Sequence, residues 1–186
     1  MELNQAIHAR RAVREYTTQP VDETTLRGLI EAAILAPSAM NEQPWLFTVI
    51  RDKALLARIS AAGKAATLAA ASAGGGQPRH LEKLENSAFD ILYHAPVLIV
   101  ISSATGGRCA VENCALAAQN LMLAARAAGL GTCWIGLAQG WIGTPEGKSA
   151  LGLPPDCLPV APIIIGHTAS FPPPVPRKAP DITWIG

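Results

Sequence analysis

The sequence predicts one domain of the mixed class, in which helices pack on β-strands. Helical patterns, with apolar residues three and four positions apart, alternate along the chain with short apolar runs typical of buried strands. At 186 residues the chain is long enough to enclose one hydrophobic core. The sequence contains no internal repeat and no second domain, so we expect a single domain over residues 1–186.

The N-terminal third is expected to form two helices and a strand. Residues 3–12 have the pattern of a short helix that ends in a basic cluster. Asp22 is a suitable N-cap for a second helix, which Pro37 stops. A run rich in β-forming residues at 46–50 then predicts a buried strand. The apolar face of the second helix consists of Leu26, Leu29, Ile30, Ala33 and Ile34.

Residues 63–79 differ in composition from the segments around them. Asp52 is expected to cap a third helix that runs to about Ala62. The segment after it is rich in alanine and then contains three consecutive glycines at 74–76. Such a composition has little to bury, so we predict a mobile loop or lid. A passive surface loop fits the composition equally well.

The second half of the chain continues the alternation of helices and strands. Residues 108–128 form the longest helical pattern, rich in alanine and poor in charge, with Gly129 at the position after the C-cap. A helix buried on nearly every side has this composition. The other predicted elements are a helix over 80–94, a short helix opened by Thr144 and Pro145, and strands over 97–101, 132–137 and 162–165.

The chain ends in a proline-rich arm over residues 171–186. Repeated prolines oppose a helix and favour an extended chain. An extended arm needs a surface to lie on, and Trp184 would anchor it there. We expect this arm to wrap a second subunit.

Composition excludes some partners and favours self-association. The formal net charge of +1 and the pI of about 7.7 do not suggest nucleic-acid binding. Charged residues make up 16%, against roughly 25% in a typical soluble domain, while hydrophobic residues reach 49%. We therefore expect part of the surface to be buried in an oligomer.

The apolar segments predict neither a membrane protein nor a secreted one. Uncharged apolar stretches such as 95–101 are too short to span a bilayer, and residues 1–12 lack the apolar core of a signal peptide. We therefore expect a cytoplasmic protein. The cysteines form no C-x-x-C pair and are expected to be small buried or half-buried thiols; they are Cys109, Cys114, Cys133 and Cys157.

Two segments of the sequence carry residues suited to a ligand, whereas a nucleophile elbow, a P-loop and a dinucleotide-binding glycine turn are absent. Arg10 and Arg14 lie four residues apart, and paired guanidinium groups suit a phosphate or a ring carbonyl. A solvated basic face explains the same pair by composition alone. Residues 36–45 combine a helix stop, small residues, amides and an indole. Amides can read the edge of a flat heteroaromatic ligand, and small residues allow its close approach.

These segments resemble those of the nitroreductase-like flavoproteins, in the same order and almost from end to end. The two most distinctive are RRAVREY at 10–16 and PSAMNEQPW at 37–45. The sequence also resembles the family at its central strand, its long dimer helix and its flavin-facing strand. The remaining matches are APVLIV at 95–100, AAQNL at 117–121, GLGTCWIG at 129–136, LGLP at 151–154, and the closing pair Arg177 and Lys178.

The resemblance implies an α+β fold, with a mixed, mainly antiparallel central sheet surrounded by helices. It also implies a homodimer with two FMN sites at the interface. Arg10 would hold the FMN phosphate together with Arg177 and Lys178 from the arm. Arg14 would lie at the N1/O2 edge of the flavin, where a fixed cation stabilises the charge of the reduced ring.

The other cofactor-binding residues come from two segments. Pro37, Ser38, Ala39 and Asn41 would reach the flavin across the dimer interface. Backbone amides of a later segment would point at the N5 and O4 region of the ring. No side chain has to act as a catalytic acid, because the flavin performs the chemistry. The resemblance implies binding also by Arg11, Gln43, Trp134, Ile135, Gly136 and Leu137.

The activity implied by the resemblance is reduction of a small flat acceptor, such as a nitroaromatic or a quinone. NADH or NADPH would supply the electrons through a two-step hydride relay on FMN. An FMN-binding sensor or carrier without turnover is the alternative from another class. A flavin-modifying or reductively dehalogenating branch is a second one, although residues 63–79 show no Glu-Tyr-Lys lid pattern. Ala12 and Ala39 depart from the hydroxyl residues common at these positions in the family.

Overall fold

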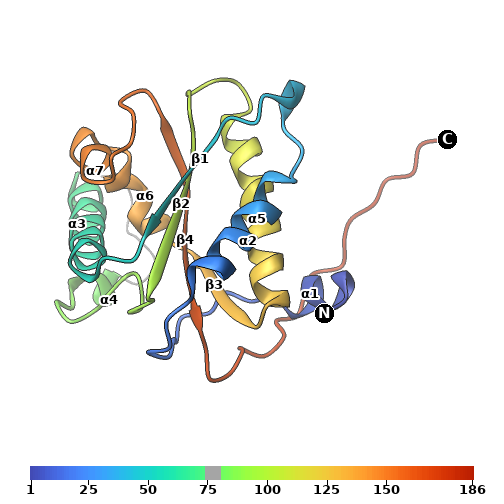
Figure 1. Cartoon of the computed structure of the whole chain (residues 1–186), viewed down its shortest axis with the longest axis horizontal. Coiled ribbons are helices and arrows are strands. Elements are labelled where there is room, and N and C mark those ends of the chain that lie inside the picture. Colours follow the sequence, from blue (N-terminus) through green and yellow to red (C-terminus); the bar gives the residue numbers. More distant parts are fainter. Residues whose placement is uncertain (74–80) are drawn as a thin grey trace.

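A computed structural model of the chain describes residues 1–73 and 81–186. It confirms the α+β class, because a four-stranded sheet lies between two layers of helices (Figure 1). The strands all pair antiparallel in the order β1-β2-β4-β3, and an isolated parallel bridge joins Ala12 to Thr132 beside β3. Their bounds are β1 (Trp45–Ile50), β2 (Val97–Ser103), β3 (Leu130–Trp134) and β4 (Leu158–His167).

Each face of the sheet has its own hydrophobic core. The two central strands alternate their side chains between the cores, so that Ile99 packs on one side and Leu98 on the other. The first core lies under α2 and α5, and the second lies under α3 and α6 (Figure 1). The bounds of these helices are α2 (Glu23–Ile34), α3 (Lys53–Ser72), α5 (Ala110–Ala127) and α6 (Gly136–Ile142).

Several helix ends lie where the sequence places them. The Asp22 carboxylate accepts a hydrogen bond from the Thr25 amide at 2.8 Å and so caps α2. Gly129 has φ of 78°, the left-handed conformation that favours glycine after a helix. The shorter helices are α1 (Leu3–Ala9), the 3-10 helix η1 (Ala39–Asn41), α4 (Leu81–Glu85) and α7 (Pro145–Ala150), the last capped by Thr144.

The prediction of a loop from residue 63 onward is wrong as far as residue 72. Asp52 caps α3 as expected, but the helix continues ten residues beyond Ala62, to Ser72. The reason is that alanine is the strongest helix former, and these residues need no large apolar face to stay helical. Gly63 is tolerated because it lies against α6, where an added Cβ would be 3.0 Å from the Leu137 carbonyl oxygen. Residues 74–79 of the predicted loop lie outside the described residues.

Other boundaries also differ from the prediction, and the strand expected over 162–165 is the longer β4, Leu158–His167. The helix expected over 80–94 is only α4, and a chain of turns follows, in which Tyr93 and His94 have positive φ. The strand expected over 132–137 ends at Trp134, because Gly136 begins α6. The first helix ends at Ala9 instead of Ala12, since the chain there leaves the helix to run beside β3.

Two predictions about burial are wrong for the single chain. α5 is buried on one face and not on nearly every side, because Val111 and Leu116 are 54% and 45% exposed. β1 is an edge strand, so it is less buried than expected and Val49 is exposed. Both departures leave apolar surface uncovered.

Within the described residues, one helix is long and apolar enough to cross a membrane by length and composition alone, namely α3. It packs on protein in this structure. Arg58 forms an ion pair with Glu146 at 2.9 Å, and the Lys64 ammonium donates to three backbone carbonyls between Asn86 and Phe89.

Candidate functional site

The N-terminal basic segment is attached to the outer strand of the sheet. The Val13 amide donates to the Thr132 carbonyl at 2.9 Å, and the Thr17 amide donates to the His167 carbonyl at 2.8 Å. Arg14 lies between these two hydrogen bonds. Its guanidinium carbon is 5.8 Å from the centre of the Tyr93 ring, a cation–π distance.

Arg10 and Arg14 form a positive cluster beside β3. Burial raises the pKa of the Cys133 thiol, and the charges of Arg14 and Arg10 oppose that rise, so both cations act on the same strand. Among the described residues, the ion pairs involve other cations, and neither Arg10 nor Arg14 has a carboxylate partner. Two cations without internal counter-ions suit an anionic ligand.

Among the described residues, Arg11 forms structural hydrogen bonds, unlike Arg10 and Arg14. Its guanidinium donates to the carbonyls of His8, Arg10 and Pro173, the last at 3.4 Å. It therefore joins the end of α1 to the start of the C-terminal arm. A cavity of about 360 Å³ lies where these segments meet. It is lined by Ala12, Val13, Arg14, Glu15, Ser170, Phe171, Pro172 and Pro173.

The predicted flavin-facing segment crosses from β3 into α6. The Ile135 amide is not available to a ligand, because it donates to the Pro162 carbonyl at 2.8 Å. Gly136 and Leu137 open α6, and the first amides of a helix have no carbonyl partner within it. These two amides are therefore the donors that this segment can offer. Trp134 packs toward the core under α5 instead.

The segment from Pro37 to Gln43 forms a tight loop around η1. The Gln43 amide donates to the Ser38 hydroxyl at 3.0 Å, and the Gln43 side chain donates to Asn41 at 3.0 Å. Met40, Asn41 and Gln43 have φ between 48° and 55°, a left-handed conformation that costs non-glycine residues energy. Asn113 of α5 supports the loop from below, because its side-chain oxygen accepts from the Ala39 amide at 2.9 Å.

The two predicted groups of binding residues lie at opposite ends of α5. Asn113 holds the loop near the start of α5, whereas Arg126 near its end donates to the Ala9 carbonyl beside Arg10. At about 1.5 Å per residue, these two contacts are roughly 20 Å apart along the helix. One chain therefore does not bring Arg10 and Arg14 together with Ser38 and Asn41.

The C-terminal arm leaves the domain and extends away from it (Figure 1). Arg177 and Lys178 are exposed, and Trp184 is 86% exposed. Within one chain the arm residues are therefore not beside Arg10. The start of the arm is fixed, because the Arg126 guanidinium stacks over the Phe171 ring at 3.7 Å.

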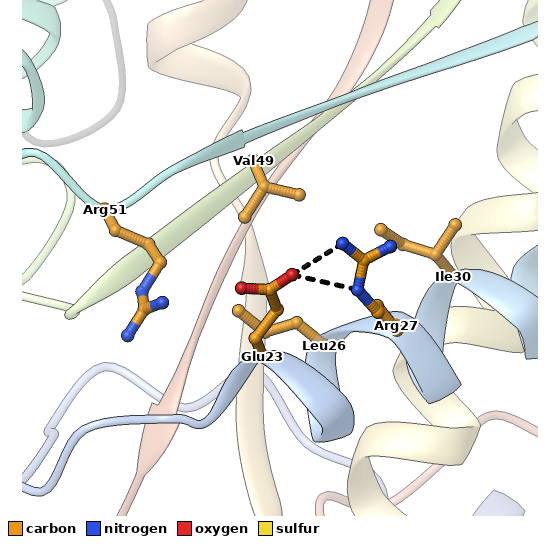
Figure 2. A pocket seen from close by; sticks show the side chains of 6 residues that line it. All are labelled: Glu23, Leu26, Arg27, Ile30, Val49 and Arg51. Carbon is orange, nitrogen blue, oxygen red and sulfur yellow. Dashed lines mark hydrogen bonds and ion pairs between the residues drawn. The ribbon is translucent and has the colours of Figure 1, made fainter.

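A second cavity, of about 290 Å³, lies between α2 and the edge strand β1 (Figure 2). An ion pair of Arg27 and Glu23 closes one side, and Val49 and Arg51 come from the strand and its end. This cavity contains none of the residues that the sequence predicts for a site.

Three residues at the candidate site were not predicted from the sequence as site residues. Tyr93 lies in a segment that was expected to be helical, so its contact with Arg14 could not be predicted. Cys133 was expected only as a buried thiol. The only sequence feature that marks Asn113 is its place as a polar residue on the buried face of a helix. Buried polar side chains usually form hydrogen bonds.

Comparison with known proteins gives one family and one fold. The model of the Nitroreductase family matches residues 7–167. A Bacteroides fragilis nitroreductase with bound FMN is 27% identical, with a TM-score of 0.85 over 100% of both chains. A Desulfitobacterium hafniense nitroreductase with bound FMN is 26% identical, with a TM-score of 0.82 over 99% of this chain and 98% of the other.

Curated relatives match over shorter segments, which cover a third of their length or less. A Thermus thermophilus NADH dehydrogenase is 53% identical over 45 residues, 24% of this chain and 22% of the relative. A Rhodospirillum rubrum 5,6-dimethylbenzimidazole synthase is 47% identical over 45 residues, 24% and 21% of the two chains. A Hydra vulgaris iodotyrosine deiodinase is 33% identical over 54 residues, 29% and 20% of the two chains.

Proposed function

The chain belongs to the Nitroreductase family, and on this premise we propose that it is an FMN-dependent oxidoreductase. It would use NADH or NADPH to reduce a small flat acceptor such as a nitroaromatic or a quinone. The observation that carries the proposal is that the Ala12–Thr132 bridge and the Val13–Thr132 hydrogen bond hold the segment with Arg10 and Arg14 beside β3, without carboxylate partners for either arginine in the described part of the chain. Similar chains of known structure carry bound FMN.

The residues present fit this cofactor. FMN has an anionic phosphate and a flat ring with polar edges, so it needs cations, amide donors and close backbone approach. The cations are Arg10 and Arg14, and the free helix-start amides are those of Gly136 and Leu137. The amide side chains of Asn41 and Gln43 lie in the exposed loop around η1.

Each residue has a role in this proposal. Arg10 binds the phosphate through charge-assisted hydrogen bonds, and Arg177 and Lys178 of the arm add charge there. Arg14 would supply the positive charge for one polar edge of the ring, and Gly136 and Leu137 would supply backbone donors for another. When bound, FMN supplies the hydride and electron transfer that no side chain can perform.

We propose a homodimer in which each site is built by both chains. Pro37, Ser38, Ala39, Asn41 and Gln43 would complete the site of the other subunit, because α5 separates them from Arg14 within one chain. Uncovered apolar side chains support such an interface. They include Leu35, Met40, Val111 and Leu116, and Leu35 also lines an apolar cavity of about 370 Å³ between α1, α2 and α5. The arm would wrap the partner.

The test is anaerobic reduction of the reconstituted protein. The purified chain is loaded with FMN, freed of excess cofactor, and mixed with NADH or NADPH while the yellow absorbance is followed. Bleaching that a quinone or nitroaromatic then reverses is the expected result. A flavin that stays oxidised with both nucleotides would contradict turnover and favour a sensor or carrier. Failure to bind FMN would contradict the whole proposal.

A further inference from the structure

Two glycines face each other across β3 and β4, where the N-terminal segment crosses the sheet. Gly131 and Gly166 are direct partners in the antiparallel ladder, so side chains at both positions would stand on one face. Neither is among the glycines with positive φ, so backbone conformation does not explain why glycine stands there. Glycine inside a strand weakens it and often marks the close approach of another segment.

The space above the two glycines is filled by residues on either side of Arg14. A Cβ at Gly131 would lie 2.7 Å from a Val13 methyl carbon. A Cβ at Gly166 would lie 2.7 Å from Cδ1 of Tyr16 and 2.8 Å from Cδ of Pro96, which packs there as well. All three distances are too short for non-bonded carbon atoms. We call the pair Gly131 and Gly166 the glycine notch, because their missing side chains make the space that Val13 and Tyr16 occupy.

Hydrogen bonds fix the segment in the glycine notch at both ends. The Val13 amide donates to Thr132, next to Gly131, and the Thr17 amide donates to His167, next to Gly166. The Tyr16 hydroxyl donates back to the Val13 carbonyl at 2.8 Å and closes the loop on itself. Val13 is 1% exposed, so one side of Arg14 is fully anchored.

We propose that Gly131 and Gly166 are positioning residues for Arg14. Arg14 is exposed, and its guanidinium has the cation–π contact with Tyr93 but no ion pair among the described residues, so its side chain alone holds it weakly. Its backbone is held because Val13 and Tyr16 are seated in the glycine notch. This inference rests on the proposed function, in which Arg14 sets the charge at one edge of the flavin. A side chain at position 131 would move that charge without touching the cofactor.

The experiment compares variants of the full chain reconstituted with FMN. Gly131→Ala places a methyl group against Val13, and the double variant Val13→Gly with Gly131→Ala returns the space. Arg14→Ala gives the reference for a lost charge. Gly28→Ala is the matched control, since a Cβ there meets nothing within 4 Å. Three quantities are measured: amide exchange of Val13 and Thr17 without FMN, the FMN dissociation constant, and the midpoint potential of bound FMN.

In Gly131→Ala, the Val13 amide hydrogen is expected to exchange several-fold faster than in the unaltered protein. The midpoint potential of bound FMN should fall, as it should in Arg14→Ala. The double variant should recover both values, and Gly28→Ala should match the unaltered protein. If Gly131→Ala does not fold, Val13→Ala can replace it, because it removes the Val13 methyl groups from the glycine notch without creating a clash. Amide exchange and midpoint potential should then change in the same directions but by smaller amounts. An altered potential in Arg14→Ala but not in the notch variants would overturn the positioning role alone. An unaltered potential and affinity in Arg14→Ala would overturn the role of Arg14 in the proposed function, and the positioning role with it.

Discussion

The side-chain oxygen of Asn113 lies 2.9 Å from the backbone nitrogen of Ala39, and the Asn113 carbonyl accepts from the Trp45 indole at 3.0 Å. One residue at the start of α5 therefore holds both ends of the loop that carries Ser38 and Asn41. Asn113 is 2% exposed, and its two hydrogen bonds to the loop are part-buried.

Asn113→Ala is therefore expected to lower stability and to weaken FMN binding together. The substitution leaves the Ala39 amide without its partner, at a cost of about 1–3 kcal/mol. Part of that cost is offset, because the buried Asn113 side-chain nitrogen, which has no partner among the described residues, is removed as well. Thermal unfolding and FMN titration measure the two effects. Thr144→Ala removes a comparable acceptor, of the Gly147 amide at the start of α7, and should affect stability alone. Unchanged FMN affinity in Asn113→Ala would show that the loop does not reach the cofactor.

Arg10 and Arg14 should differ in what their removal changes. Arg10→Ala is expected to weaken FMN retention by roughly 10- to 100-fold, the equivalent of losing one charge-assisted contact of about 1.5–3 kcal/mol. Arg14→Ala should instead lower the midpoint potential and slow reduction by NAD(P)H. Arg51→Ala, at the cavity of Figure 2, is the control for a lost surface charge. Identical affinity and potential in both variants would mean that the cluster is a solvated face.

The purified protein should be yellow and should release FMN, not FAD, when denatured. The cationic cluster can hold one phosphate, and the sequence has no glycine turn for an adenylate half. Chromatography of the released cofactor decides between the two. Recovery of FAD would contradict the arrangement of phosphate-binding residues proposed here.

Mixed dimers test whether each site uses two chains. One parent lacks the Arg14 side chain and the other lacks those of Ser38 and Asn41, so each homodimer is expected to be inactive. Refolding them together should restore activity. In a mixed dimer, one site contains both altered segments, and the other combines the intact Arg14 of one chain with the intact Ser38 and Asn41 of the other. The fraction of mixed dimers is measured with two different affinity tags. Mixed dimers that form but remain inactive would exclude the shared site.

Alkaline pH should destabilise the fold through its buried thiols. Burial raises the pKa of Cys114 from 9.0 to about 11. The stability that the neutral thiol contributes is complete below pH 9, where the unfolded chain is also neutral, and is lost as the pH rises toward 11. Cys114→Ala should therefore reduce the difference between urea midpoints at about pH 8 and about pH 10.5. Some difference should persist, because burial also raises the pKa values of Cys133 and Tyr16. An equal difference in both proteins would exclude Cys114 as a contributor.

The strands and capped helices could be predicted from the sequence because their signals are local. Asp22 and Gly129 each mark a helix end within a few residues, and β2 is a continuous apolar run. The residues after Gly63 misled the prediction, since an alanine-rich helix has no apolar periodicity to detect. The Arg14–Tyr93 contact depends on a turn near residue 93, and no local sequence pattern predicts that turn.

The candidate site was predictable as a set of segments but not as an arrangement. Motif order identified the basic segment and the loop from Pro37 to Gln43, yet no spacing in the sequence shows that α5 holds them apart. The role of Arg11 also depends on tertiary structure, because only the folded chain brings Pro173 to its guanidinium. Glycine at 131 and 166 cannot be distinguished from other strand glycines until Val13 and Tyr16 are seen above them.

The left-handed residues of the loop around η1 have a consequence for attempts to make this protein more heat-resistant. Met40 has φ of 51° and is 93% exposed in the single chain, so Met40→Gly would relieve roughly 1 kcal/mol of backbone strain within the subunit, and it would also remove one apolar side chain from the proposed interface. A selection for thermostability would therefore favour glycine at this position. The same change would free the backbone on either side, next to Ala39 and Asn41, and so loosen the loop in the unliganded protein. Thermostable variants obtained in this way should lose cofactor affinity as they gain melting temperature, and a library scored for both properties would separate the two at this position.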